Sequence, residues 1–222
     1  YEPQSGLEVF SILVPRGWKV SGGVTWVISR PAAPFQSSLQ IYNPGGPEAF
    51  ETFPALYFTW DNNPLTQMTK PTGSLHFGYE VCQPMAARDI LRQFVLPHYR
   101  RIPGLEVAQE GQALELQQAV TQNKAAQAQG GQYSADSARV RLHYSHNNIP
   151  IAEELSGVAE YTRIYTPSLF GGSELILWGM DYLTSFRANR DQLESYAGLY
   201  RAMFGSIRIN PSWTAFVQQV IQ

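Results

Sequence analysis

The chain has 222 residues, a formal net charge of −2 and only 15% charged residues. Hydrophobic residues make up 44% of it and include twelve Tyr, eleven Phe and five Trp, a composition typical of a folded domain and not of a disordered chain. The weak charge gives no basic surface for nucleic acid or anionic lipid, so we expect neither as a partner. Because no apolar run approaches the roughly 18–20 residues of a membrane span, we expect no membrane-spanning segment.

The first part of the chain alternates apolar and polar residues, which is the pattern of half-buried strands. We predict strands over 7–14 and 24–30, joined as an antiparallel hairpin through the segment PRGWKVSGG at 15–23, and a third strand over 37–43. The prolines and glycines of 15–23 favour a turn, because proline fixes φ and glycine tolerates positive φ.

The middle of the chain mixes short strands with helices. We predict strands over 55–60, 74–81 and 105–111, a loop over 61–73, and helices over 84–96 and 113–131. Apolar residues recur at i, i+3, i+4 and i+7 in the helix over 84–96, which makes it amphipathic, and we expect Pro97 to end it. The helix over 113–131 has a thin apolar stripe, so we expect it to be exposed with a mobile tail.

The second half carries the clearer sheet signal. We predict strands over 137–146, 157–167 and 173–186 and a helix over 190–207 that Asn189 caps. The segment 173–186 is apolar at both odd and even positions, as in a central strand that is covered on both faces. Helices are therefore expected on both sides of the sheet.

These elements predict an α+β fold, a mainly antiparallel sheet with helices on both faces in an α/β/α sandwich. No linker and no internal repeat divides the chain, so we expect a single domain over 1–222. The sequence begins with Tyr1 and not with Met, and we therefore expect a processed or excised piece of a longer product.

The last segment predicts an amphipathic helix over 212–222 with Ser212 as its cap. Its apolar stripe is formed by Trp213, Phe216, Val217, Val220 and Ile221. The stripe reaches the final residues without a glycine or basic stop, so the helix looks as if it continues into a longer parent chain. Either the helix packs on its own sheet, or its stripe docks a following segment or another protein through Trp213, Val217, Val220 and Ile221.

PRGWKVSGG is the stretch most similar to a phosphate-binding loop, which requires G-x-x-x-x-G-K-[ST]. Gly17 and Gly22 have the required separation, but Gly23 and Val24 stand where the lysine and the hydroxyl belong. A strand follows, so the helix N-terminus that attracts phosphate is missing as well. The segment is interpreted as a turn.

Metal and nucleophile chemistry find little support. His143 and His146 are three residues apart on a predicted strand, where their side chains diverge, so we expect no metal and no cofactor. Cys82 is the single cysteine, and we interpret it as a buried thiol without a neighbouring base.

Two carboxylates and one loop remain as candidates. Glu160 and Asp181 lie on predicted neighbouring strands and can approach, although one solvated and one backbone-bonded carboxylate is the more ordinary expectation. The loop formed by Trp60, Asp61, Asn62 and Asn63 combines an aromatic ring with carboxylate and amide groups, which suits sugar or peptide contacts, but it also suits a half-buried loop anchor.

Two stretches of the chain resemble PsbP-like domains. Phe10, Pro15, Gly17 and Trp18 form the pattern F-x-x-x-x-P-x-G-W, which resembles the strand and turn that open these domains, and residues 182–213 resemble their final strand and helix. The superfamily includes the PsbP subunit of the oxygen-evolving photosystem, a Ran-binding import factor and uncharacterised bacterial exported proteins or lipoproteins. The resemblance implies a sheet sandwiched between helices, Trp18 as a core or hairpin anchor, and an extracytoplasmic location.

Two functions are compatible with these patterns. The first is a non-catalytic binding or assembly module that acts through contacts with a protein partner outside the cytoplasm, which accounts for the missing catalytic motif. The alternative is a hydrolase or carbohydrate-acting enzyme with a loop-built site near Trp60, His76 and Glu160. A pocket with convergent carboxylates favours the enzyme, and carboxylates scattered over the surface favour the binding module.

Overall fold

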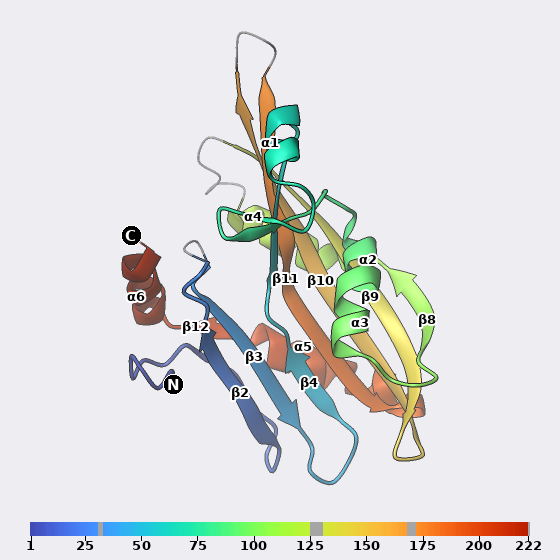
Figure 1. Ribbon diagram of the computed structural model, residues 1–222. Helices are drawn as coiled ribbons and strands as arrows, with labels where there is room; N and C mark the ends of the chain where they lie inside the picture. The colour runs from blue at the N-terminus through green and yellow to red at the C-terminus, as the bar shows by residue number, and fades with distance from the viewer. Residues whose placement is uncertain (31–32, 125–130, 168–171, 222) are drawn as a thin grey trace.

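The computed structural model describes residues 1–30, 33–124, 131–167 and 172–221, without the side chain of Ile221 (Figure 1). Its larger sheet contains β2 (Lys19–Trp26), β3 (Phe35–Tyr42), β4 (Ala49–Thr52), β5 (Leu56–Asp61), β6 (Leu75–His76), β7 (Tyr79–Val81), β8 (Glu106–Gly111), β9 (Gln132–His146), β10 (Ile149–Thr166) and β11 (Ser173–Asn189). A separate two-stranded sheet pairs β1 (Phe10–Ser11) with β12 (Arg208–Ile209). The helical elements are α1 (Pro64–Thr69), α2 (Ala87–Ile90), the π-helical turn η1 (Leu91–Val95), α3 (Leu96–Tyr99), α4 (Leu114–Lys124), the 3-10 helix η3 (Arg190–Tyr196), α5 (Ala197–Gly205) and α6 (Pro211–Ile221).

The strands follow the order β2-β3-β4-β11-β10-β9-β8, and β5 pairs with the first part of β11. All neighbours in this order are antiparallel, and the pairing of β5 with β7 is parallel. The α+β class and the mainly antiparallel sheet are thus confirmed. The PsbP-like form of the sandwich and the single domain over 1–222 stay predictions.

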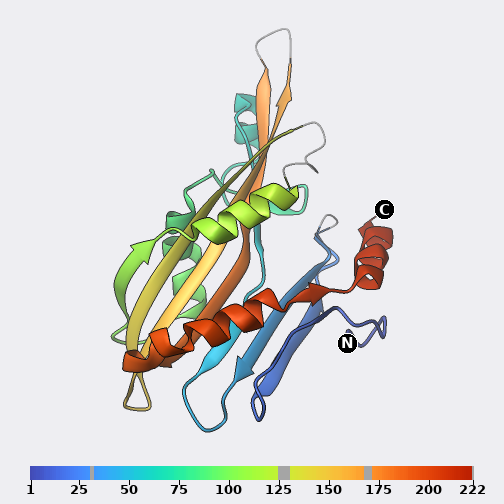
Figure 2. The ribbon, with the colours of Figure 1, turned by 180° about the vertical axis from the view of Figure 1, so that it is seen from behind.

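The long strands β9, β10 and β11 form the centre of the molecule. A tight turn joins β9 to β10 through Asn147 and Asn148, both with positive φ, which matches the twist of a two-residue hairpin. On one face of the sheet lie α2, η1 and α3 (Figure 1). On the other face lie α4 and α5 (Figure 2).

Each helix layer covers its own part of the core. Ile90, Leu91 and Val95 are fully buried against the first face, in a cluster that also contains Trp178 and Leu142. Burial of each such aliphatic side chain contributes roughly 1.5–3 kcal/mol. On the second face, a smaller cluster packs α5 and η3 against β3, β4 and β11.

The helix predicted over 84–96 forms, but it does not end at Pro97. It continues to Tyr99, because the π-helical turn η1 precedes the proline and the Leu96 N–H donates to the Leu91 carbonyl oxygen. Pro97 then lies in the first turn of α3, directly after the π-helical turn, and the helix continues past it. The prediction that Pro97 terminates the helix is wrong for this reason.

The predicted hairpin between 7–14 and 24–30 is also wrong. β1 pairs with β12, and β2 begins at Lys19 and pairs with β3. The turn is confined to PRGW, where Trp18 N donates to the Pro15 carbonyl oxygen over 3.1 Å. Gly22 lies inside β2 with positive φ, and a Cβ there would collide with the Ser38 carbonyl oxygen of the paired strand.

Other boundaries differ in detail. The predicted loop over 61–73 contains α1, β4 had no predicted counterpart, and the helix over 190–207 is split into η3 and α5. Asn189 does not cap η3, since its amide donates to the Gln192 side chain. Ser212 does not cap α6 either, because its own N–H donates to Asn210 Oδ1 over 3.0 Å. The tail expected after α4 falls largely on 125–130, outside the described residues.

Candidate functional site

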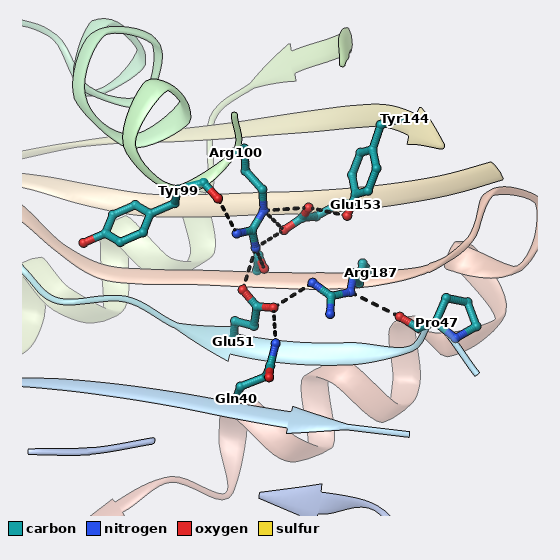
Figure 3. A network of polar contacts seen from close by, with 9 residues as sticks. Gln40, Pro47, Glu51, Tyr99, Arg100, Tyr144, Glu153 and Arg187 are labelled. Atoms are coloured by element: carbon teal, nitrogen blue, oxygen red, sulfur yellow. Dashed lines mark hydrogen bonds and ion pairs between the residues drawn. The ribbon is translucent and has the colours of Figure 1, made fainter. Parts of the chain in front are cut away.

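A buried network of ion pairs lies on the face of the sheet that α3 covers (Figure 3). Arg100, the residue after α3, points between β4 and β10 and lies 2.6 Å from a carboxylate oxygen of Glu51 and 2.6 Å from one of Glu153. The Glu153 side chain is 0% exposed and the Arg100 side chain 9%. Arg187 of β11 lies 2.7 Å from the other oxygen of Glu51. Tyr144 donates to Glu153 over 2.9 Å.

The pKa directions follow from these contacts. Burial alone would raise the pKa of Glu51, but the charges of Arg100 and Arg187 outweigh burial and lower it. Burial alone would lower the pKa of Arg100, but its bonds to Glu153 and Glu51 raise it. Glu51 and Arg100 therefore stay ionised at neutral pH and bind one another, which indicates a structural role for this network.

A cavity of about 370 Å³ adjoins the network and is lined by Arg100 and Arg187 together with Tyr42, Tyr99 and His146. Its two arginines already serve the buried carboxylates, so the cavity offers little uncompensated charge to a ligand.

The second concave site lies on the opposite face of the sheet, beside α4. It is an open pocket of about 330 Å³, which we name the tyrosine–carboxylate pocket. Its polar and aromatic walls are formed by Tyr57, Tyr79, Lys124, Tyr133, Glu160 and Asp181.

Strand register explains why these side chains converge. Glu160 of β10 pairs with Gly179 of β11, and Asp181 lies two residues further along β11, so both carboxylates point to the same face. Glu160 also pairs with Ala135 of β9, which places Tyr133 on that face as well. The rings of Tyr57 and Tyr79, which lie on β5 and β7, are 6.0 Å apart at the pocket edge.

Internal contacts occupy Glu160 more fully than Asp181. Lys124 Nζ at the end of α4 lies 2.8 Å from Glu160 Oε2, and Tyr133 donates to Glu160 Oε1 over 2.7 Å. Lys124 also lies 5.3 Å from the centre of the Tyr182 ring, a cation–π distance. Asp181 Oδ1 accepts the N–H of Tyr182, the next residue, over 2.7 Å.

The electrostatics of the pocket separate its groups. Burial raises the pKa of Asp181, and the charge of Glu160 adds to this effect against the opposing influence of Tyr182 N–H and Lys124. Burial and the neighbouring carboxylates raise the pKa of Tyr57, and burial with the Glu160 bond raises that of Tyr133. At neutral pH the tyrosines are therefore uncharged donors and aromatic walls.

The structure brings Glu160 and Asp181 together in one pocket, as their predicted positions on neighbouring strands allowed. Glu160 is not the solvated carboxylate of the ordinary expectation, since Lys124 and Tyr133 hold it. Sequence reasoning missed Lys124, Tyr133 and the two tyrosines of β5 and β7. Of these, only Tyr133 could have been found from the sequence. It lies an even number of residues before Arg139, so in a strand that began earlier than 137 it would point to the same face as Arg139.

The other predicted site residues do not join this pocket. Trp60 packs against the core on the first face of the sheet, away from Glu160. His76 lies on β6 next to Phe77, against which its ring stacks. The enzyme site predicted near Trp60, His76 and Glu160 is thus not assembled as one cluster, because strand alternation sends Trp60 and Glu160 to opposite faces.

The polar residues of the Trp60 loop have local partners. Asp61 Oδ1 accepts the Asn63 N–H over 2.8 Å, and Asn63 Oδ1 accepts the Leu65 N–H over 2.9 Å as the cap of α1. Asn62 Oδ1 accepts the N–H of Glu174 over 2.8 Å. These bonds are those of a loop anchor. Ligand binding by Trp60 and the three polar residues stays a prediction.

The C-terminal helix α6 packs on the N-terminal part of the molecule. Trp213 is 2% exposed and lies 5.7 Å from the ring of Trp26, and Val217 is buried beside Val9. Val220 is 48% exposed, and the side chain of Ile221 lies outside the described residues. Two of the four residues predicted to dock a partner therefore serve the helix's own packing, and docking through the end of the stripe stays a prediction.

The part of the chain that the structure describes contains neither a metal-binding cluster nor a membrane-spanning helix. It holds no group of three or more His, Cys, Asp or Glu side chains arranged to bind a metal ion. His143 lies on β9 and His146 is exposed at the end of that strand. None of the described helices has the length and apolar character needed to span a membrane.

Comparison with known proteins assigns no family. No protein-family model matches the chain, and no curated protein sequence does. Among solved structures, the chain is similar to the crystal structure of LpqN, which is involved in cell envelope biogenesis of Mycobacterium tuberculosis. The sequences are 13% identical, the match covers 91% of this chain and 83% of that chain, and the TM-score is 0.30. At that similarity we transfer neither function nor site residues.

Proposed function

We propose that the chain is a non-catalytic binding module that acts outside the cytoplasm and receives a ligand, or a group of a protein partner, in the tyrosine–carboxylate pocket. The observation that carries this proposal is the convergence of aromatic rings, two carboxylates and a lysine on one open pocket of about 330 Å³. Binding sites typically combine apolar and aromatic walls with a few placed polar groups, and this pocket has both. The extracytoplasmic location is supported by the resemblance to exported PsbP-like proteins.

The contacts of Glu160 favour binding over catalysis. Both of its oxygens have partners, Lys124 and Tyr133, so activation of a water molecule would first require one of these bonds to break. The raised pKa of Tyr133 likewise disfavours the tyrosinate that a tyrosine base or nucleophile requires.

Binding can be tested by heteronuclear NMR with a panel of small ammonium salts, neutral saccharides and carboxylates. We expect at least one chemical class to shift the amide signals of Gly179, Asp181 and Thr162, which line the pocket. Tyr79→Ala should weaken that response, and Tyr165→Ala, which truncates an exposed tyrosine, is its matched control. If every probe shifts only amides outside the pocket, the proposed site is wrong.

A second candidate, a hydrolase acting on glycosides, is favoured by the shared pocket of Glu160 and Asp181. Burial raises the pKa of Asp181, as a general acid requires. The other carboxylate, Glu160, is paired with Lys124. Hydrolysis of nitrophenyl glycosides by the wild-type chain and by Asp181→Asn and Glu160→Gln tests this function. Turnover that both variants abolish would favour the enzyme, and equal background rates in all three proteins would favour the binding module.

A further inference from the structure

The pocket already shows how it holds a positive charge. The Lys124 ammonium group lies between the Glu160 carboxylate, at 2.8 Å, and the face of the Tyr182 ring, at 5.3 Å. A carboxylate combined with an aromatic face is the usual protein environment of a bound ammonium group, because the ring quadrupole and the negative charge both attract cations. Lys124 satisfies only one of the two carboxylates in this way.

Among the described residues, no cation forms an ion pair with Asp181 as Lys124 does with Glu160. The hydrogen bond found for its carboxylate among the described contacts comes from the Tyr182 N–H, and Lys124 pairs with Glu160 instead. If all three side chains are ionised, two carboxylates share one ammonium group, and the pocket is left with one negative charge. Burial raises the pKa of Asp181, which is the expected response of a carboxylate without a close cation.

The remaining walls suit a cation of modest size. The rings of Tyr57 and Tyr79 meet at an interplanar angle of 54°, so they form two sides of a corner. Tyr57 and Tyr133 line the same pocket as both carboxylates, which places all of these groups around one space. Tilted aromatic rings beside a carboxylate form the kind of cage that selects alkylammonium groups.

We propose that the tyrosine–carboxylate pocket binds an organic ammonium group, which pairs with Asp181 against the tyrosine rings. The inference rests on the proposed binding function and names its ligand class. The same chemistry is found on a free small amine and on a lysine side chain that a protein partner inserts. Lys124 binds Glu160 in the way that we expect the ligand's ammonium group to bind Asp181, and both lie in the same pocket.

The test titrates two ammonium probes into the full chain and follows amide shifts by heteronuclear NMR. Choline represents a free amine, and its neutral analogue with carbon in place of nitrogen is the matched control. Nα-acetyl-lysine methylamide represents an inserted side chain, with the norleucine derivative as its control. We expect the charged probes to shift the amides of Gly179 and Asp181 and the neutral analogues to leave them unchanged. A preference for the lysine derivative would indicate a protein partner, and a preference for choline a free ligand.

Three variants separate recognition from simple surface attraction. Asp181→Asn keeps the size of the side chain and removes its charge, so we expect about tenfold weaker binding of the charged probes. Glu106→Gln removes an exposed carboxylate of β8 and should leave their affinity unchanged. Lys124→Met removes the internal cation and should strengthen binding, an effect that a purely structural lysine would not produce. Thermal unfolding of each variant establishes that it is folded at the titration temperature.

The possible failures are distinguishable. Saccharides that shift the pocket amides while the ammonium probes do not would overturn the ammonium assignment and leave the binding function standing. Equal binding of charged probes and neutral analogues, or unchanged affinity in Asp181→Asn, would also overturn it. A pocket that no probe perturbs would refute the ligand class and the proposed function together.

Discussion

Replacement of Arg100 by methionine is the sharpest test of the buried network. Methionine keeps much of the aliphatic volume but leaves the fully buried Glu153 without its cation, and Glu51 with Arg187 alone. Removal of one partner from a buried ion pair costs about 3–5 kcal/mol, because the remaining charge stays in a poorly solvated site. We therefore expect Arg100→Met to lower the free energy of unfolding by about 3–5 kcal/mol.

Arg92 provides the matched control for this measurement. It lies in η1, the helical turn that leads into α3, and pairs with Glu110 at 2.6 Å, but its side chain is 53% exposed. Exposed pairs contribute about 0–1 kcal/mol, so Arg92→Met should be nearly neutral. Equilibrium urea denaturation followed by tryptophan fluorescence compares the two variants. The double variant Arg100→Met with Glu153→Gln should be more stable than Arg100→Met alone, since the second change removes the stranded charge.

The pH dependence supplies an independent criterion. The folded pKa of Glu51 is lowered, so Glu51 contributes stability that is present above its unfolded pKa and is lost as pH falls through the folded value. Arg100→Met removes part of that lowering, and the stability difference from wild type should therefore shrink from neutral pH to about pH 3. The interpretation of the network as a source of stability would be refuted by equal effects of Arg100→Met and Arg92→Met, or by a pH-independent difference.

Three further predictions concern packing and backbone. Trp18 is half-buried against the α5 cluster, so Trp18→Ala should cost about 1–3 kcal/mol in urea denaturation, and an unchanged midpoint would remove it from the core. Trp213→Ala should lower the free energy of unfolding by about 3–5 kcal/mol, whereas Val220→Ser should lower it by less than about 0.5 kcal/mol. Weakened self-association of Val220→Ser in sedimentation would support docking through the end of α6, and a large loss of monomer stability in Val220→Ser would exclude it. Tyr182 has φ of 54°, so Tyr182→Val should be less stable than Tyr182→Asn by about 1 kcal/mol, and equal thermal midpoints would contradict backbone strain there.

The central sheet could be predicted because its signals are local. The alternation over 137–146 follows from a strand with one face in the core, and the two-sided apolar character of 173–186 follows from a strand that is covered on both faces; the structure has β9 and β11 there. The helix over 84–96 was equally visible, since four of its apolar residues, Ala87, Ile90, Leu91 and Val95, are fully buried. The periodicity of apolar residues shows which face of an element is buried, and each of these elements buries the face that its sequence indicates.

The N-terminal region could not be paired correctly, because strand pairing is not a local property. Alternation identifies a strand but not its partner, and β1 pairs with β12 from the other end of the chain. Gly22 and Gly23 suggested a turn, yet Gly22 serves close approach of the Ser38 carbonyl within a strand. A glycine can indicate either a turn or the close approach of another backbone, and the neighbouring residues did not show which of the two applied to Gly22.

The candidate site was partly visible for the same reason. Glu160 and Asp181 were expected on adjacent strands, and adjacency alone allowed them to meet. Lys124 reaches the pocket from α4, and Arg100 reaches the network from α3, so both depend on how a helix docks on the sheet. Helix docking is set by tertiary packing, which single-sequence patterns do not encode.

One irregularity in β11 explains how a single strand serves both sites. Strict alternation would place Asp181 and Arg187 on the same face, since they are an even number of residues apart. The register with β10 shifts between Ser156 and Val158, which gives β11 one extra residue, and Tyr182 takes up the bulge with positive φ. Residues before the bulge therefore point one way and residues after it the other, so Asp181 faces the pocket beside α4 while Arg187 faces the network beside α3. The pocket and the network depend on that extra residue, because without it one of these two charged side chains would lie on the wrong face of the sheet.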